Sequence, residues 1–392
     1  MKPPLLIFIG IFLALYGGMH CYIYKNLLAA GYFSPWPLAL VLAFVWLAPL
    51  LTHMAARMGF NILAVTISWI GYLWMGFAFL FFSFSVLSGL WQLFIDAAGG
   101  LIGFDAARLA LRGPFYSTAL PACLALIASV YGLAAARRIN LEHILLVSSK
   151  LNNMQASFRI TQISDLHIGL MTSEAWARRL VEAVNSTGPD VIVSTGDLVD
   201  GQPDHLERFA DILSGLKARY GKFAVTGNHE AFAGLERSLE FTARAGFRVL
   251  SSQSVNIHGL VNIVGVDDPI ALKMENIADR PAESTLVEAL PRGQVIVLLK
   301  HQPLVDKESA RRFDLQLSGH VHAGQIFPFY LLTRLVYHNA MGLTRAGDHS
   351  WLYTSRGAGT WGPPMRFLAP AEITLIEFVP GNENPRGLAA GA

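Results

Sequence analysis

The sequence predicts an N-terminal α-helical membrane domain followed by a layered α/β domain. Hydrophobic residues make up 53% of the 392-residue chain and charged residues only 15%, and the apolar excess lies in residues 1 to about 136. Beyond that point, short apolar strands alternate with amphipathic helices, which is typical of layered α/β packing. Several short strands late in the chain indicate a second, mixed sheet.

Four apolar stretches in residues 1–138 are long enough for a helix that crosses a bilayer, which takes about 20 residues. A shorter amphipathic helix is expected over Phe104–Leu111, lying in the membrane interface. We therefore predict a multi-span transmembrane domain over residues 1–138. Its spans are expected at Leu5–Tyr22, Pro35–His53, Asn61–Ser85 with an apolar continuation to Ile95, and Phe115–Ala135.

The residues around these spans predict whether the first span is cleaved and how the spans are oriented. No small-x-small cleavage site follows the first span, so it is expected to be retained rather than removed as a signal peptide. The side of the membrane that holds both termini would carry four Lys and Arg residues, and the opposite side three. Because cytoplasmic loops are enriched in Lys and Arg, this count weakly favours the cytoplasm for the C-terminal half. The centres of the spans contain no Asp, Glu, Lys or Arg, so they are typical of an anchor rather than a transport path. His20 lies near a span end and is interpreted as an interfacial histidine.

The C-terminal half is expected to begin with a linker over residues 139–157, in which Ile144–Val147 could form an edge strand. A folded α/β domain is expected over residues 158–379. The tail, residues 380–392, is rich in Gly, Pro, Asn and Ala and is predicted to be disordered.

Polar clusters follow five of the expected strands, directly after the strand or a few residues later. Ligands in an open α/β sheet gather beyond the carboxyl ends of the strands, so separate loops would deliver two Asp, one Asn and five His to one place. The clusters are Asp165-Leu166-His167, Gly196-Asp197, Gly227-Asn228-His229-Glu230, His301 and Gly319-His320-Val321-His322.

This combination of side chains predicts a pair of transition metal ions. Imidazole and carboxylate ligands select Zn, Fe or Mn, and two such ions about 3.5–4 Å apart can clamp a phosphoryl group. Asp165 and His167 are alternate residues of an extended strand end, so both could reach one ion, and His320 and His322 have the same spacing. The neighbouring glycines would permit tight turns and close approach to a phosphate.

Each cluster taken alone also has a structural interpretation. Asp197 after a glycine could form only a turn, Asn228 could cap a helix, and His301 could be a loop histidine with ordinary partners. Five such clusters in order at five strand ends favour the functional interpretation of the whole set.

The ordered set D-x-H, G-D, G-N-H-E, H and G-H-x-H resembles the calcineurin-like metallophosphoesterase superfamily, over about residues 158 to 378. Two further stretches resemble a branch of membrane-attached bacterial phosphoesterases, Gly246-Phe247 with Val264–Pro269 and Ser355–Gly357 through Arg366 to Ile373. The multi-span N-terminal half is similar to that of the vertebrate transmembrane protein with metallophosphoesterase domain. The bacterial resemblance implies an integral multi-pass protein of the bacterial plasma membrane.

The resemblance also implies a fold and a role for each site residue. The fold would be a four-layer α/β/β/α sandwich. One metal ion would be held by Asp165, His167 and His322, the other by Asn228, His301 and His320, with Asp197 bridging them. His229 would remain unligated and stabilise the transition state or protonate the leaving oxygen, while metal-bound hydroxide would be the nucleophile.

The substrate is not defined by these motifs. We favour a phosphomonoester or phosphodiester of a lipid or small molecule, with the lipid bilayer as a partner. A nuclease or protein phosphatase is the second interpretation, but the net charge of only +2 argues against nucleic acid. The third interpretation is a catalytically silent membrane receptor or scaffold that retains the metal-binding fold. Such a relic would be expected to have lost ligands, and this sequence contains the full set.

Overall fold

The computed structural model describes residues 3–31, 33–102, 113–152, 157–200, 206–275, 280–381 and 389–390. The chain divides into two compact units. We call Met1–Ala135 with Gly362–Phe367 the helical unit, and Ala136–Trp361 with Leu368–Ala392 the α/β unit.

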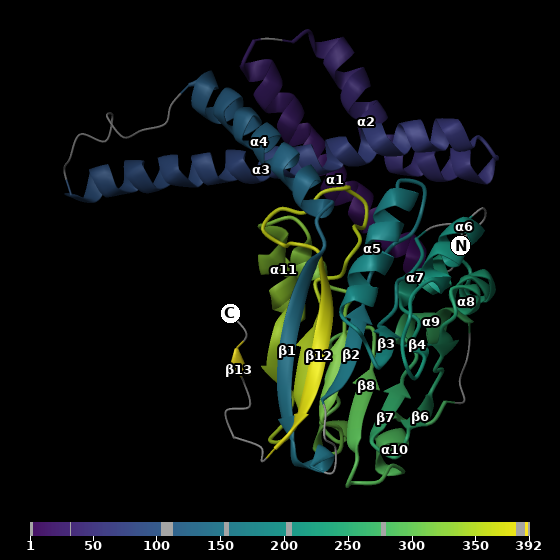
Figure 1. The fold of residues 1–392 in the computed structure, drawn as a ribbon. Helices are drawn as coiled ribbons and strands as arrows, with labels where there is room; N and C mark the ends of the chain where they lie inside the picture. The colour runs from purple at the N-terminus through teal and green to yellow at the C-terminus, as the bar shows by residue number, and fades with distance from the viewer. Residues whose placement is uncertain are drawn as a thin grey trace. The chain divides into compact units, whose positions relative to one another are not determined.

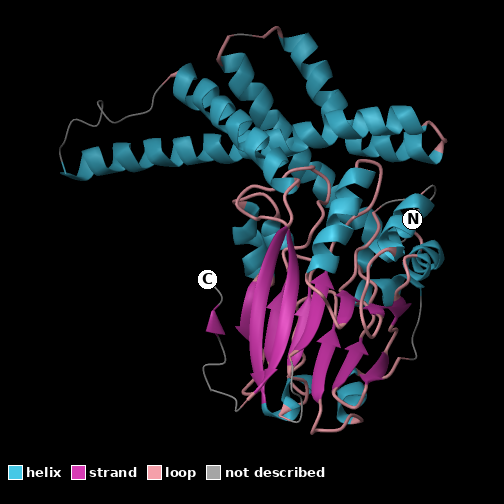
Figure 2. Ribbon diagram, in the orientation of Figure 1, coloured by secondary structure: helices cyan, strands magenta, loops and turns pink. Residues whose placement is uncertain are grey.

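The helical unit contains long apolar helices (Figures 1 and 2). Within the described residues, three helical stretches are long and apolar enough to cross a membrane: Pro35–Arg57, Asn61–Leu101 and Phe115–Ala136. They coincide with three of the predicted spans, and the remaining one, Leu5–Tyr22, falls within a 27-residue helix. The elements are α1 (Pro3–Ala29), α2 (Pro35–Arg57), α3 (Asn61–Ile102), the π-helix η2 (Phe115–Ala119) and α4 (Leu120–Ala136). The amphipathic helix predicted over Phe104–Leu111 lies outside the described residues.

Hydrogen bonds from aromatic side chains tie α1 to its neighbours. The indole N–H of Trp46 on α2 donates to the Leu13 carbonyl at 3.2 Å. The indole N–H of Trp74 on α3 donates to His20 Nε2 at 2.9 Å. His20 is buried among the helices, and its other ring nitrogen bonds the Tyr16 carbonyl at 2.8 Å. The polar ring atoms of His20, Trp46 and Trp74 are thus paired within the unit, as an apolar surrounding favours.

The segment Gly362–Phe367 belongs to the helical unit although it comes late in the sequence. The Arg366 amide donates to the Gly132 carbonyl at 3.0 Å, and both Met365 and Arg366 are fully buried. Small residues on the helices make room for it, since a Cβ on Gly76 would lie 2.5 Å from Met365 Sδ. The sequence placed this segment inside a continuous domain over residues 158–379, and the structure differs because glycines create a receiving surface on α3 and α4.

The α/β unit is built on two sheets. The seven-stranded sheet has the order β13-β1-β12-β2-β3-β4-β5 and the six-stranded sheet the order β10-β11-β9-β8-β7-β6. The strands of the first are β13 (Ala389–Ala390), β1 (Asn140–Ser148), β12 (Glu372–Pro380), β2 (Phe158–Ile163), β3 (Val191–Ser194), β4 (Lys222–Ala224) and β5 (Arg248–Val249). Those of the second are β10 (Gly342–Arg345), β11 (Trp351–Thr354), β9 (Leu315–Ser318), β8 (Val295–Leu299), β7 (Val261–Gly265) and β6 (Gln253–Ile257).

Helices cover the outer faces of both sheets. An apolar core between the sheets joins residues such as Ile160 and Val193 to Val297 and Leu317. A second core packs α5, α6 and α8 on the seven-stranded sheet, and a third packs α10 on the six-stranded sheet. The predicted α/β/β/α layering is therefore confirmed. The helices are α5 (Glu174–Ser186), α6 (Glu207–Ser214), α7 (Asn228–Ala233), α8 (Leu235–Arg244), α9 (Pro269–Glu275), α10 (Glu283–Glu288) and α11 (Phe329–Val336), with 3₁₀ turns η3 (Ser149–Leu151), η4 (Ser309–Arg311) and η5 (His322–Gly324).

The predicted linker differs most from the structure. Asn140–Ser148 forms the nine-residue strand β1, which pairs in parallel with all of β12, as Figure 1 shows for these two long neighbouring arrows. The strand is not an edge strand, because β13 pairs with its other side. This pairing also means that part of the predicted disordered tail, Ala389–Ala390, lies in the sheet. Only three residues, 137–139, separate α4 from β1.

Candidate metal centre

The structure brings together all eight residues that the sequence singled out. Asp165 and His167 follow β2, Asp197 follows β3, and Asn228 begins α7 just after β4. These three strands are parallel neighbours in one sheet, so their carboxyl ends meet at one edge. The other sheet contributes His301 after β8 and His320 and His322 after β9, a parallel pair as well.

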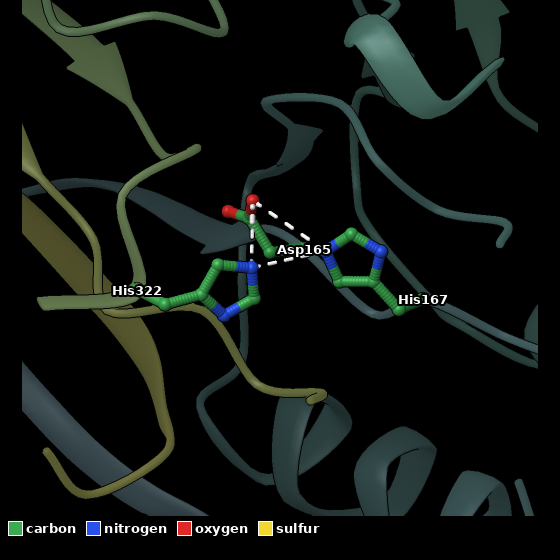
Figure 3. Close-up of side chains that lie close together, drawn as sticks. All are labelled: Asp165, His167 and His322. Carbon is green, nitrogen blue, oxygen red and sulfur yellow. Dashed lines mark hydrogen bonds and ion pairs between the residues drawn. The ribbon is translucent and has the colours of Figure 1, made fainter. Parts of the chain in front are cut away.

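Asp165, His167 and His322 form the first group of donor atoms (Figure 3). His167 Nε2 lies 3.0 Å from His322 Nε2. Asp165 Oδ1 lies 3.4 Å from His322 Nε2 and 4.0 Å from His167 Nε2. All three side chains are buried, so their nitrogen and oxygen atoms converge on one point inside the unit.

The second group surrounds His301 Nε2. That nitrogen lies 3.1 Å from Asn228 Oδ1 and 3.2 Å from His320 Nδ1. It also lies 3.1 Å from Asp197 Oδ2, and the same oxygen is 3.8 Å from His167 Nε2. A single carboxylate oxygen of Asp197 therefore lies between the two groups.

The backbone of the site is held in an unusual conformation. Ten non-glycine residues of the described chain have positive φ, and five of them are Asp165, His167, Asp197, His320 and His322. Left-handed backbone is costly for such residues and collects at functional sites. The sequence predicts extended strand ends at these positions. The structure instead directs these side chains through left-handed turns, which is why His320 and His322 point into different groups.

Two glycines beside the donor residues leave room for the carboxylates of Asp197 and Asp165. A Cβ on Gly227 would lie 2.1 Å from Asp197 Oδ1, and one on Gly319 would lie 2.1 Å from Asp165 Oδ2. Any side chain at these positions would displace a donor group.

Glu230 organises the loops around Asp197, a role that the sequence did not reveal. Its carboxylate accepts the backbone N–H groups of Asp197 at 3.0 Å, Leu198 at 2.7 Å and Gly227 at 2.7 Å. The side chain is buried. One carboxylate thereby fixes the positions of two donor-bearing loops.

Asp200 was also missed. Its Oδ1 lies 3.0 Å from His229 Nδ1, and the His229 amide donates to Asp197 Oδ1 at 2.9 Å. His229 is thus held between two carboxylates, with its ring edge against His167 at 4.6 Å between centroids. Its ring also belongs to a donor cluster with His167 and Asp197. The D-x-x-D spacing of Asp197 and Asp200 after a buried strand is the signal that could have found Asp200.

The electrostatics separate the histidines into two kinds. Burial lowers the pKa of His167 to about 4 and that of His320 to about 3, so both are neutral at pH 7 and can offer a lone pair. Burial also opposes charge on His229, but Asp197 and Asp200 outweigh it and raise its pKa to about 9. Burial raises and the neighbouring histidines lower the pKa of Asp197, which is held well below its ordinary value.

The donor set fits metal ions. Nitrogen and oxygen atoms face one another over 3.0–3.4 Å in both groups, yet a neutral imidazole has a single N–H and an ionised carboxylate has none. Lone pairs that converge without enough protons are satisfied by cations. Imidazole, carboxylate and amide donors without thiolate are typical of Zn, Fe or Mn sites.

A two-sheet α/β unit with such a centre at its strand ends is suited to metal-dependent hydrolysis. Comparisons with known proteins agree. The family model for calcineurin-like phosphoesterase matches residues 158–324. An uncharacterized metallophosphoesterase of Aquifex aeolicus is 35% identical over 219 residues, which cover 56% of this chain and 84% of that protein. An uncharacterized metallophosphoesterase of Helicobacter pylori is 35% identical over 235 residues, 59% of this chain and 63% of that one.

A longer match involves the transmembrane protein with metallophosphoesterase domain from Danio rerio, which is 31% identical over 287 residues. That match covers 69% of this chain and 65% of the Danio protein, slightly less than two thirds of its length. The chain belongs to the calcineurin-like phosphoesterase family, and it is a metal-dependent hydrolase of phosphoric esters. The resemblance seen in the sequence motifs is confirmed.

Proposed function

We propose that this protein is a membrane-anchored phosphoesterase with two metal ions. Asp165, His167 and His322 would hold one ion. Asn228, His301 and His320 would hold the other. The observation that carries the proposal is the position of Asp197 Oδ2, within 3.1 Å of His301 Nε2 and 3.8 Å of His167 Nε2, where one oxygen can serve both groups. Two divalent ions, when bound, supply Lewis-acid activation of the phosphoryl group and of water.

We assign His229 the role of proton donor to the leaving oxygen. Burial lowers the pKa of the ring, but Asp197 and Asp200 outweigh it and raise the pKa, which favours the protonated form. Asp200 accepts the Nδ1–H in a 3.0 Å hydrogen bond. The Nε2 proton is then left for the substrate. Asp200 is a positioning residue in this scheme, since it orients the ring and stabilises its charge.

The apolar helices support the proposed anchoring in a membrane, and the Danio relative carries the word transmembrane in its name. We place the chain in the bacterial plasma membrane, with the α/β unit on the cytoplasmic side indicated by the Lys and Arg distribution. The substrate we favour is a monoester or diester of a lipid or small-molecule phosphate.

Hydrolysis assays on the full chain in detergent test the proposal. Loaded with Mn, Fe or Zn, the protein should cleave nitrophenyl phosphate esters, and comparison of the monoester with the diester defines the preferred bond. Chelation should remove activity, and added metal should restore it. An Asp197→Asn variant keeps the shape of the side chain and should lose turnover. Equal turnover by this variant would show that the assigned centre is not responsible.

A further inference from the structure

Helix α11 exposes an apolar surface to solvent. Six large apolar side chains between residues 327 and 336 are exposed, and α11 contains no buried residue. Leu335 is 77% exposed and Val336 69%. We call this set the α11 patch; it consists of Phe327, Phe329, Leu331, Leu332, Leu335 and Val336.

Other helices of the α/β unit behave differently. Helix α5 buries Trp176, Leu180 and Val184 against the sheet, and α8 buries Phe241. Helix α11 has a single charged residue, Arg334, and no apolar face turned inward. A concentrated exposed apolar patch on an otherwise well-packed unit marks an interaction site.

The α11 patch is joined to the metal centre. The helix begins seven residues after His322 and is followed by Tyr337, whose ring lies 5.5 Å from that of His320. The Tyr337 hydroxyl donates to Gln302 Oε1 at 3.4 Å. The chain before α11 is fixed too, because Gln325 and Trp361 exchange two hydrogen bonds of 2.8 and 3.0 Å. The patch is therefore held at a defined edge of the site.

Exposed aromatic side chains also border the site beside His229. Phe232 is 42% exposed and its ring lies 5.5 Å from that of His229. Trp361 is 44% exposed with its ring 5.8 Å from the same histidine. A buried polar centre is thus flanked by apolar surface near both His320 and His229. A substrate with a phosphate ester head and an apolar body fits this arrangement.

The chain itself indicates what covers the patch. Helix α4 ends at Ala136 and β1 begins at Asn140. Even a fully extended chain spans at most roughly 14 Å between these two residues. If the helices span a bilayer, as proposed above, the α/β unit stays within reach of its surface. Leu, Phe and Tyr side chains with one Arg are the composition of a helix that lies in a membrane interface.

We propose that α11 is an interfacial membrane helix that inserts the α11 patch into the leaflet and presents the metal centre to phosphate esters of membrane lipids. The inference rests on the proposed anchoring and deepens the proposed function by naming the substrate class. Its two parts, insertion and lipid hydrolysis, have separate readouts.

Insertion is tested by spin labelling of the full chain in phospholipid vesicles. Cys21 and Cys123, both free, are first replaced by alanine. A nitroxide at Leu335→Cys should collide readily with oxygen and poorly with a water-soluble nickel chelate. The matched control is Glu236→Cys on α8, an exposed position of the same unit, which should show the reverse. Equal nickel access at both positions in vesicles overturns the proposal.

A second copy of the chain is the other occupant that the label can detect. Dipolar broadening at Leu335→Cys that disappears on dilution with unlabelled protein would show a protein interface and would also overturn the proposal. Labels that stay unbroadened and shielded from nickel support the bilayer.

Lipid hydrolysis tests the second part. A Leu332→Asn, Leu335→Asn double variant should hydrolyse a vesicle-embedded lipid phosphate ester at least about tenfold more slowly, because interfacial binding scales with apolar area. Its turnover of a soluble nitrophenyl ester serves as the control for folding and should be unchanged. Undiminished lipid turnover, or a wild-type protein that cleaves the soluble ester and no lipid ester, overturns this part. Failure of the wild type on every ester would instead count against the proposed function.

Discussion

His20 in the helical unit and His301 in the α/β unit are both buried histidines, but their ring nitrogens have different partners. Each places Nδ1 on a backbone carbonyl, that of Tyr16 at 2.8 Å and that of Thr195 at 2.7 Å. The Nε2 of His20 accepts the indole proton of Trp74. The Nε2 of His301 faces the oxygens of Asn228 and Asp197 and a nitrogen of His320. The first ring completes a local network, whereas the second joins a set of donors that requires a cation.

The largest effect should come from the carboxylate shared by the two donor groups. Asp197→Ala should reduce turnover below detection and lower the content of both ions, because each group loses an oxygen and less negative charge remains between the cations. Elemental analysis and hydrolysis of a nitrophenyl ester measure the two losses. The control is Asp211→Ala, which removes an exposed carboxylate on α6 and should change neither quantity. Full occupancy by two metal ions in Asp197→Ala would contradict the shared role.

His229→Ala should separate turnover from metal binding. Both ions should stay, while turnover falls by roughly 10²–10⁴-fold if the ring is a general acid. The loss should shrink for a nitrophenolate leaving group, which needs no proton. An empty metal position in this variant would instead identify His229 as a ligand, as its cluster with His167 and Asp197 permits.

Asp200→Asn should have a smaller effect that appears in the pH profile. Turnover should fall by roughly 10–100-fold, the usual cost of losing a group that orients a functional histidine. Activity requires the protonated ring, so it is lost as pH rises through the pKa of His229. Asp200 raises that pKa, and its removal should therefore move the alkaline limb to lower pH. If the rate falls but the alkaline limb of the pH profile stays at the same pH, Asp200 has a purely structural role.

The smallest effect on chemistry should come from His20→Leu. It removes the hydrogen bond from Trp74 and should cost roughly 0.6–2 kcal/mol of helix packing, visible as a lower Tm in detergent. Turnover of a soluble ester should stay within about twofold of the wild type. His301→Leu is the matched substitution in the α/β unit and should abolish turnover. Loss of metal in His20→Leu would remove the distinction between the two histidines.

The sequence predicted that these side chains would gather at one place, because each follows a buried apolar strand and parallel strands bring their carboxyl ends together. It could not predict how the backbone turns at Asp165 or His322, since left-handed conformations there are imposed by the surrounding structure. The roles of Asp200 and Glu230 were not predicted, for a related reason. Both act through hydrogen bonds to other loops, and those partners are set by the folded chain. Of the two, only Asp200 has a signal in the sequence, its D-x-x-D spacing from Asp197.

The boundaries were harder to predict than the site. The strand β1 contains polar residues such as Asn140 and Glu142 at its exposed start, so only Ile144–Val147 had the apolar character of a strand. The segment Gly362–Phe367 carries no apolar run, and its place in the helical unit depends on small residues about 230 and 290 positions earlier. Contacts at such separation leave no periodic trace in the sequence.

The return of Gly362–Phe367 to the helical unit has a consequence for biosynthesis. Chains emerge from the ribosome with their N-terminus first. Gly76 and Gly132 are therefore made long before Met365 and Arg366, and the surface that receives this segment can exist before the segment does. If the helices are then already inserted in the bilayer, the last portion of the chain closes onto a template that the first portion has prepared. An N-terminally truncated chain lacks this template and would leave Met365 uncovered.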